Sequence, residues 1–238
     1  MNVLWVLAHP EPRSLNGALR DEGLRTLADL GHDVRQSDLY AMRWNPVVDD
    51  AADTCDQDTC DHDVRREQEK LLWADALVVQ FPLWWHSVPA ILKGWFDRVF
   101  AKGFGFGVRD GDGRVLRYGE GTLAGRRAFV ITTAGARAAG MGPRGVHGDA
   151  EQVLFPLLHG TLWYTGMSVL PPLVLTGADR LTPGGYRAAA AELRRRLRSL
   201  PTAAPIPYRA EHGGDYDEHL VLRPHVAPGR CDLAVHRA

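Results

Sequence analysis

The chain has 238 residues, of which 45% are hydrophobic and 24% are charged, and its formal net charge is -1. This length and composition predict one globular domain with a sizeable core. The balanced charge gives no reason to expect a nucleic-acid partner. No run approaches the roughly 18 to 20 apolar residues of a membrane span, and the first residues lack the pattern of a signal peptide, so we expect a cytoplasmic protein.

The three cysteines, Cys55, Cys60 and Cys231, are an odd number that suits a reducing compartment without disulfides. Cys55 and Cys60 lie with His62 in the acidic stretch 49–63. The CxxxxC spacing is loose for a metal site, and no second pair of ligands follows it. We therefore interpret this stretch as a solvated loop and expect no metal site.

The first part of the chain has the pattern of a strand, a helix and a second strand. Residues 2–8 form a nearly continuous apolar run, which is typical of a strand buried on both faces of a parallel sheet. Ser14 can cap a helix that Gly31 ends. Residues 32–39 predict a second strand, and their polar character favours a position near a sheet edge.

The middle of the chain repeats this alternation. A helix-like stretch over residues 64–73 leads to the apolar strand 76–81. A helix with an apolar face follows over residues 89–100, with Pro89 in its first turn. The glycine-rich segment 103–121 predicts a long hairpin or a mobile flap.

The last part adds strands over residues 127–132 and 168–175, with a helix over 151–164 between them. Thr182 and Pro183 then begin a final helix that ends near Leu200. Five strands alternating with helices predict an α/β fold with a doubly wound, five-stranded parallel sheet flanked by helices. We expect this domain to cover residues 1–200 and a C-terminal extension to cover 201–238.

The loop after the first strand predicts a phosphate-binding site. In such a sheet, ligands bind beyond the carboxyl ends of the strands. This loop has neither a GxGxxG nor a P-loop motif. However, Ser14, Leu15 and Asn16 lie at a helix start, where free backbone N–H groups and the positive end of the helix dipole attract a pyrophosphate. The alternative is that Ser14 only caps the helix.

The loops after the third and fourth strands indicate a planar ligand. Trp84 and Trp85 follow a strand end directly, and aromatic walls of this kind can bury a flat ring while backbone groups bind its polar edge. The alternative is that both tryptophans are packing residues. The segment 132–149 adds small residues that allow close approach, together with His147. Its neighbours favour a functional role for this histidine.

Several co-linear segments resemble the FAD-dependent NAD(P)H:quinone oxidoreductases of the flavodoxin-like superfamily, of the DT-diaphorase and bacterial quinone reductase type. The matching strings are LAHPEPRSLNGAL, SDLYAM, ADALVVQFPLWWHSVPAILKGWFDRVF, ITTAG and GVHGD, in the family's order and spacing. PAILKGWFDRVF is the most specific of them. The resemblance implies a flavodoxin-like oxidoreductase with FAD as cofactor, NAD(P)H as co-substrate, and a quinone or similar planar acceptor.

The resemblance also implies cofactor contacts in all three loops. The first loop would bind the FAD phosphates and ribose, and the other two would enclose the isoalloxazine ring. The implied residues are His9, Ser14, Leu15, Asn16, Pro82, Leu83, Trp84, Trp85, Thr132, Thr133, Ala134 and Gly135.

Catalytic roles follow from the same resemblance. His147 matches the family histidine that helps to place a proton or charge when hydride reaches the flavin. Met141 holds the position of the usual tyrosine partner beside the flavin, and methionine cannot donate a hydrogen bond. His86 is a candidate to replace that tyrosine, since imidazole titrates near neutral pH. We therefore expect His147, His86 and Trp85 to form the catalytic face.

The implied reaction is a ping-pong transfer, in which NAD(P)H reduces the flavin and the acceptor then takes two electrons in the same slot. The family's homodimers further predict a partner chain that completes the pocket, and a C-terminal extension that packs on the body or on the partner. Two alternatives stay open. One is an electron carrier or regulatory subunit with little turnover of its own, and the other is an FMN enzyme of the same fold.

Overall fold

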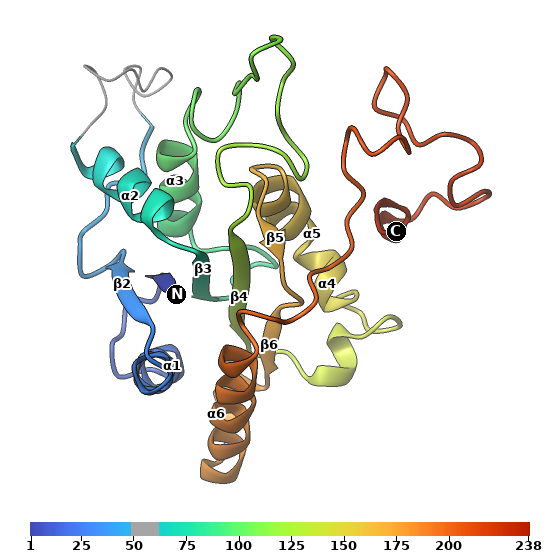
Figure 1. Ribbon diagram of the computed structural model, residues 1–238. Coiled ribbons are helices and arrows are strands. Elements are labelled where there is room, and N and C mark those ends of the chain that lie inside the picture. Colours follow the sequence, from blue (N-terminus) through green and yellow to red (C-terminus); the bar gives the residue numbers. More distant parts are fainter. Residues whose placement is uncertain (49–61) are drawn as a thin grey trace.

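The computed structural model describes residues 1–48 and 62–238. Its centre is a parallel sheet with the order β2-β1-β3-β4-β5, in which β6 also pairs with β4 (Figure 1). The strands are β1 (Asn2–Leu7), β2 (Asp33–Asp38), β3 (Ala76–Pro82), β4 (Arg127–Ala134), β5 (Ser168–Val169) and β6 (Leu173–Thr176). The predicted α/β fold with a parallel sheet is confirmed. The strand order reverses between β1 and β3, and such a point commonly forms a ligand-binding crevice.

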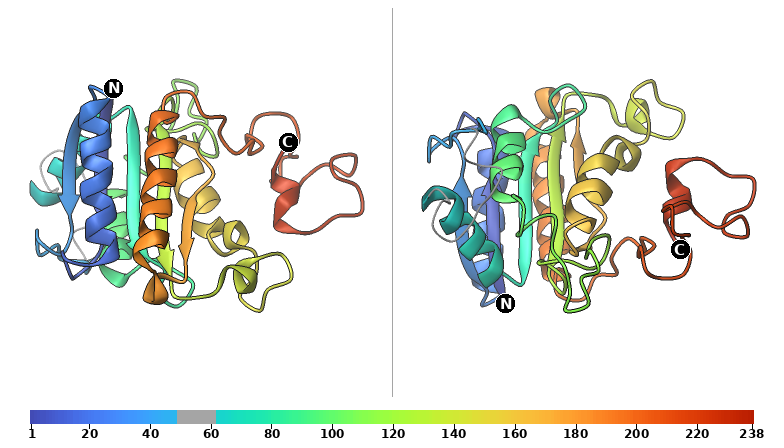
Figure 2. Two further views of the ribbon diagram at one scale, coloured as in Figure 1. Left: turned by 90° about the horizontal axis from the view of Figure 1, so that it is seen from below. Right: turned by 90° about the horizontal axis from the view of Figure 1, so that it is seen from above.

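Helices cover both faces of this sheet. Helices α1 and α6 run side by side on one face, and α2, α3 and a broken third helix cover the other (Figure 2). The bounds are α1 (Leu15–Asp29), α2 (His62–Trp73), α3 (Ala90–Val99), α4 (Ala150–Val153), α5 (Phe155–Leu157), the π-helical segment η2 (Leu158–Trp163) and α6 (Pro183–Arg198). Short 3-10 turns lie at η1 (Ala138–Met141), η3 (Ala178–Arg180) and η4 (Leu233–His236).

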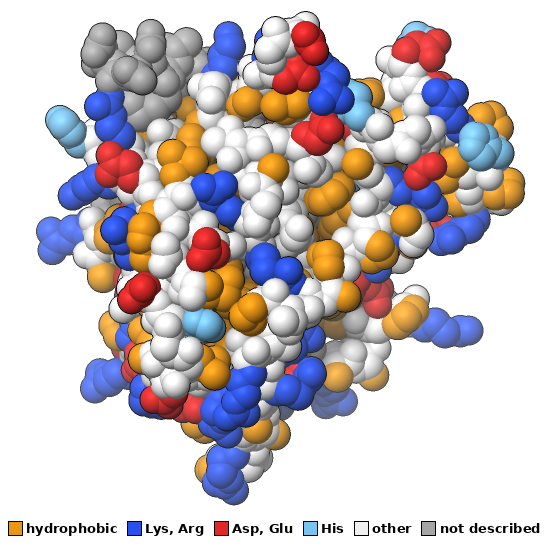
Figure 3. Space-filling view, viewed as in Figure 1, with side chains coloured by type: hydrophobic (Ala, Val, Ile, Leu, Met, Phe, Trp, Pro, Cys, Tyr) orange, Lys and Arg blue, Asp and Glu red, His pale blue; other side chains and the backbone are white. Residues whose placement is uncertain are grey.

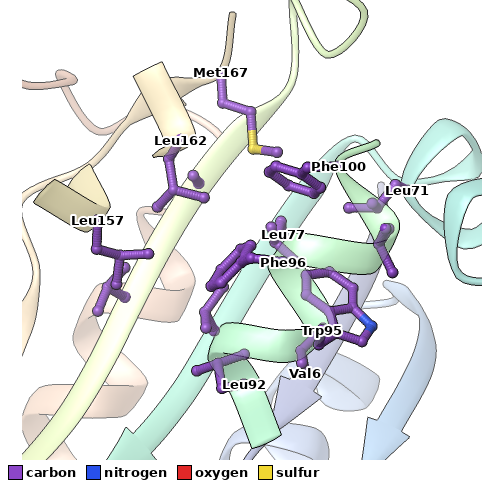
Figure 4. Close-up of a cluster of buried hydrophobic side chains, with 14 of the residues drawn as sticks. Val6, Leu71, Leu77, Leu92, Trp95, Phe96, Phe100, Leu157, Leu162 and Met167 are labelled. Atoms are coloured by element: carbon purple, nitrogen blue, oxygen red, sulfur yellow. The ribbon is translucent and has the colours of Figure 1, made fainter. Parts of the chain in front are cut away.

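Each face of the sheet has its own hydrophobic core. Under α1 and α6, the rings of Trp5 and Phe129 are buried. On the opposite face, Trp95, Phe96 and Phe100 from α3 and the residue after it pack in a cluster (Figure 4). Full burial of such a side chain contributes roughly 1.5 to 3 kcal/mol. Since all seven residues of β3 are buried, this strand runs through the middle of the molecule.

Two predicted elements are interrupted, and proline accounts for both interruptions. The fifth strand is divided into β5 and β6 at Pro171 and Pro172, which have no backbone N–H to continue a ladder. The helix predicted over residues 151–164 is broken into α4, α5 and η2 around Pro156. In addition, Pro89 precedes α3 as its N-cap instead of lying in its first turn.

The glycine-rich segment is held at the end of η2, where the Tyr118 N–H donates to the Tyr164 carbonyl at 3.0 Å, and the C-terminal extension is held at β5. Arg109 and Val115 pair as an antiparallel bridge, so the predicted hairpin is present at the tip of the segment 103–121. The Ile206 N–H donates to the Val169 carbonyl at 2.8 Å, and Tyr208 is buried. Beyond this anchor, the extension forms irregular loops that stand away from the sheet (Figure 2). The predicted domain boundary near residue 200 stays a prediction.

Among the described residues, no helix is long and apolar enough to cross a membrane. The same part of the chain holds no group of three His, Cys, Asp or Glu side chains arranged for a metal ion. Cys55 and Cys60 lie outside the described residues, and Cys231 is exposed and unpaired. Lys and Arg side chains gather at the lower end of the view in Figure 3, where α6 begins. The opposite, C-terminal turn of α6 is also basic, which suits the helix dipole.

Candidate active site

The first loop ends in a well-formed helix start. The Ser14 hydroxyl accepts a hydrogen bond from the Gly17 N–H at 3.2 Å, so its own proton is available to a ligand. The N–H groups of Leu15 and Asn16 lie in the first turn, where no intrahelical partner exists. In the same loop, His9 Nδ1 lies 3.1 Å from the Glu11 backbone nitrogen and 3.0 Å from the Glu11 carbonyl oxygen, so the backbone of the loop orients the ring. This loop can therefore present several donors to an anion.

The side chain of Asn16 has a different position from the one expected for a phosphate donor. It is only 2% exposed, and its amide donates to the Thr133 hydroxyl at 2.8 Å. The side-chain donor of Asn16 is thus used inside the protein. What the residue can offer to a ligand is its backbone N–H.

The second loop contains a tight two-residue turn. The backbone groups of Trp84 and Ser87 exchange hydrogen bonds of 3.1 and 2.9 Å, and the residues between them, Trp85 and His86, have φ values of 50° and 59°. Such left-handed backbone costs roughly 1 to 3 kcal/mol at a non-glycine residue and is often found at functional sites. The turn leaves Trp85 98% exposed. An indole held in water in this way is placed to cover a flat ligand.

A pocket of about 180 Å³ lies between the second and third loops. It brings together seven of the predicted site residues. It is lined by Leu83, Trp85, His86, Ala134, Gly135, Ala136, Met141 and His147. Its small residues and its backbone groups leave room for a planar molecule to approach the ends of β3 and β4.

The remaining predicted residues of these two loops do not line that pocket. Pro82 is buried as the last residue of β3, and the side chain of Trp84 is partly exposed beside the pocket. The Thr132 hydroxyl is buried and has no hydrogen-bond partner among the described residues. The Thr133 hydroxyl accepts a hydrogen bond from the Asn16 side-chain amide. The two threonines thus support the site from beneath.

His86 and His147 face each other across the pocket. Their ring centroids are 5.3 Å apart and their planes are inclined by 41°. Gly140 makes room for this arrangement, because a Cβ atom at that position would lie 3.1 Å from Cδ2 of His147. The backbone N–H of His147 also donates to the Gly140 carbonyl at 3.0 Å. Two imidazoles at one pocket can each offer a ring nitrogen as a hydrogen-bond donor or acceptor.

Sequence reasoning missed three residues that shape this site. Ala136 lines the pocket, and the Arg180 guanidinium donates to the Gly135 carbonyl at 2.6 Å. Gln80 lies beneath the site and is fully buried. A polar residue within the apolar run ALVVQFP was the signal for Gln80, whereas nothing near Arg180 in the sequence indicated its contact.

A family model for the flavodoxin-like fold matches residues 1–199. The chain belongs to that family. It is 43% identical to the ribosyldihydronicotinamide dehydrogenase-like protein traD of Penicillium crustosum, over 91% of this chain and 87% of that protein. It is 35% identical to the human ribosyldihydronicotinamide dehydrogenase [quinone], over 87% and 95% of the two chains.

Solved structures of this family include a protein of Klebsiella pneumoniae that is named as a quinone reductase. That protein is 47% identical in sequence, covers 100% of both chains and superposes with a TM-score of 0.94. The resemblance recognised in the sequence is therefore confirmed at the level of the family.

Proposed function

We propose that this protein is a flavin-dependent oxidoreductase that uses a dihydronicotinamide to reduce quinones or similar planar acceptors. The observation that carries the proposal is the pocket between Leu83 and Gly135, which opens at the same sheet edge as the start of α1, where free backbone N–H groups can bind an anion. A dinucleotide flavin needs a site for its ring and a site for its pyrophosphate at one such edge. The names of the three relatives described above support this activity.

The residues present fit FAD. The backbone N–H groups of Leu15 and Asn16 and the hydroxyl of Ser14 would hold the pyrophosphate, and Arg13, whose side chain is 94% exposed, adds a positive charge beside them. The pocket of small residues would hold the flavin ring. When bound, the flavin accepts hydride from the nicotinamide and passes two electrons to the acceptor.

Around that chemistry, the chain supplies binding, orientation and a proton site. Trp85 offers an aromatic face to a stacked ring, and Leu83 together with Ala134 excludes water from one side. His86 and His147 can each stabilise negative charge or hold a proton at a ring nitrogen. Met141 lies in the same wall and provides only apolar contact.

We propose that a second copy of the chain completes this pocket. At about 180 Å³, the pocket is small for a flavin and an acceptor together, and Trp85 is almost wholly exposed beside it. A separate apolar groove of about 330 Å³ runs between α3 and η2 and includes Phe96, Phe100 and Phe106. A two-fold interface over this groove would bury apolar surface and bring a second wall to the ring.

Identification of the bound flavin and steady-state kinetics test this proposal. We expect heat to release FAD, and we expect the protein to oxidise NADH, NADPH or N-ribosyldihydronicotinamide with a soluble quinone. If FMN is released instead, the cofactor of the proposed enzyme is FMN and not FAD. A protein that binds flavin but turns over none of these donors would instead be an electron carrier, which the dehydrogenase names of its relatives do not favour.

The two histidines have their own test. We expect His86→Ala and His147→Ala each to lower kcat by about ten- to a hundredfold, since a placed proton donor commonly contributes that much or more. Val146→Ala is the matched control, because this exposed side chain neighbours His147 without lining the pocket. Unchanged turnover in both histidine variants would remove them from the mechanism.

A further inference from the structure

A chain of buried hydrogen bonds runs beneath the candidate active site. The Trp5 indole N–H donates to Gln80 Oε1 at 2.9 Å, and Gln80 Nε2 donates to the Asn16 carbonyl at 2.7 Å. The Asn16 amide then donates to the Thr133 hydroxyl at 2.8 Å. The four residues are between 0% and 4% exposed, so none of these bonds is shared with bulk water.

This chain connects the three loops of the proposed flavin site. Asn16 belongs to the phosphate-binding helix start, and Thr133 lies at the end of β4, directly before the pocket residues. Gln80 is followed within β3 by the residues that lead into the strained turn. Two backbone bonds strengthen the connection. The Ala8 N–H donates to the Gln80 carbonyl at 2.9 Å, and the Leu83 N–H donates to the Thr133 carbonyl at 2.8 Å.

We propose that Gln80 is a positioning residue, which fixes the distance and orientation of the phosphate-binding loop relative to the ring-binding loops. The proposal rests on the flavin-dependent function proposed above. Because Gln80 is fully buried, it cannot touch the cofactor, and it acts only through Asn16 and its neighbours. A ligand that spans both loops should therefore depend on Gln80 more than a ligand that occupies the ring pocket alone.

The chemistry of the position supports a role that an apolar residue could not fill. The Gln80 amide satisfies the indole N–H of Trp5 and the carbonyl of Asn16 at the same time. Without it, the buried indole N–H of Trp5 would have no partner, at a cost of roughly 1 to 3 kcal/mol, and the Asn16 carbonyl would lose its hydrogen bond to β3. The least costly response is movement of the α1 start away from β3. Such movement would separate the two halves of the cofactor site.

A pair of matched variants tests the proposal. Gln80→Met keeps the length of the side chain and removes its hydrogen bonds. Val78→Ala is the control, because Val78 is fully buried two residues earlier on the same face of β3 and has no polar side-chain atom. For each variant, the affinities for FAD and for riboflavin are measured by fluorescence titration. Riboflavin carries the ring and ribityl chain without the pyrophosphate.

We expect Gln80→Met to weaken FAD binding by about tenfold or more and riboflavin binding much less. Loss of a residue that orients the groups in contact with a ligand commonly has an effect of this size. The preference for FAD over riboflavin should therefore fall in this variant and stay at the wild-type value in Val78→Ala. Thr133→Val provides a second break in the same chain of hydrogen bonds. It loses a single hydroxyl, so it keeps the proposal testable if Gln80→Met does not fold, and it should show the same change in preference.

Equal weakening of FAD and riboflavin, or an unchanged preference in both network variants, would overturn the positioning role while leaving the proposed function intact. Failure of the wild-type protein to bind any flavin would instead overturn the proposed function. The two results are distinguishable because wild-type affinity is measured first.

Discussion

The sheet edge and the outer region around η2 are held together in different ways. At the sheet edge, Gln80, Asn16 and Thr133 form neutral hydrogen bonds that are shielded from water. In the outer region, partly exposed ion pairs such as Arg117 with Glu211 join the glycine-rich segment to the extension. Neutral buried bonds are insensitive to salt and pH, whereas ion pairs and histidines respond to both. The difference indicates that the hydrogen bonds beneath the site stay fixed while the contacts of the outer region can respond to conditions.

An aromatic cluster forms the centre of the outer region. His159 on η2 stacks on Phe155 with a centroid distance of 4.6 Å and lies within 5.1 Å of the ring centroids of Tyr118 and Tyr208. Burial, together with the nearby His236, lowers the pKa of His159 to about 4. A cavity of about 300 Å³ adjoins the cluster. This histidine is therefore neutral in the folded protein at pH 7.

The largest effect should come from Gly17→Ala at the sheet edge. A Cβ atom there would lie 1.8 Å from the Pro12 carbonyl oxygen, so the loop proposed to bind phosphate has to move. We expect a loss of more than about 3 kcal/mol in the free energy of unfolding, together with loss of FAD binding.

Urea denaturation and FAD titration measure these two quantities. Gly184→Ala is the matched control, since this glycine also lies in a first helical turn and its nearest neighbours would be 3.8 Å from the new atom. The control should be neutral or slightly more stable. Equal behaviour of the two variants would contradict a rigid sheet edge.

An intermediate effect is expected from His159→Phe. The unfolded chain takes up a proton on His159 near pH 6.5, but the folded chain does so only near pH 4. Stability from this group is therefore complete above about pH 6.5 and is lost as the pH falls towards 4. After allowance for screening at this partly exposed ring, we expect the wild-type protein to lose about 1 to 2 kcal/mol there.

His159→Phe should lose correspondingly less stability between pH 7 and pH 4.5, because phenylalanine does not titrate. The urea midpoints at the two pH values give this difference. His219→Gln is the control, since its side chain is 79% exposed. A pH dependence of His159→Phe equal to that of the wild type would show that His159 has no part in the response.

The smallest effect should come from Glu211→Gln. Its carboxylate accepts from Arg117 Nε at 2.6 Å, and this hydrogen bond raises the pKa of Arg117. We expect the variant to lose about 1 kcal/mol, with a smaller loss at high salt, because the pair is only partly buried. Glu192→Gln should cost less than about 0.5 kcal/mol, since its pair with Arg195 is more exposed. Thermal melts at two salt concentrations distinguish these results.

The features that the sequence predicted correctly depend on neighbours in the chain or on the family resemblance. The buried strand at residues 2–8 follows from an apolar run, and the caps at Ser14 and Thr182 follow from residue type and position. The grouping of His86, Met141 and His147 was predicted from the family resemblance, and the pocket contains all three. The contributions of these residues to catalysis remain predictions.

What the sequence did not predict depends on contacts between distant segments. The Asn16 amide bonds to a residue 117 positions later in the chain, so no local pattern could show that it points inward. The left-handed turn at Trp85 and His86 lacks the glycine or asparagine that usually marks such a turn. The breaks at Pro156 and at Pro171 had a local signal in the prolines themselves, but the apolar patterns on either side predicted continuous elements.

The two edges of the sheet have a consequence for behaviour at high concentration. Strand β2 forms one edge, and its charged residues Asp33 and Arg35 are exposed. Charged side chains on an edge strand oppose the pairing of a further strand from another molecule. At the other edge, the Val169 carbonyl already accepts from Ile206. The charged β2 and the tethered β5 therefore oppose cross-β growth at these two strands, and we expect self-association to use helices and loops rather than either of them.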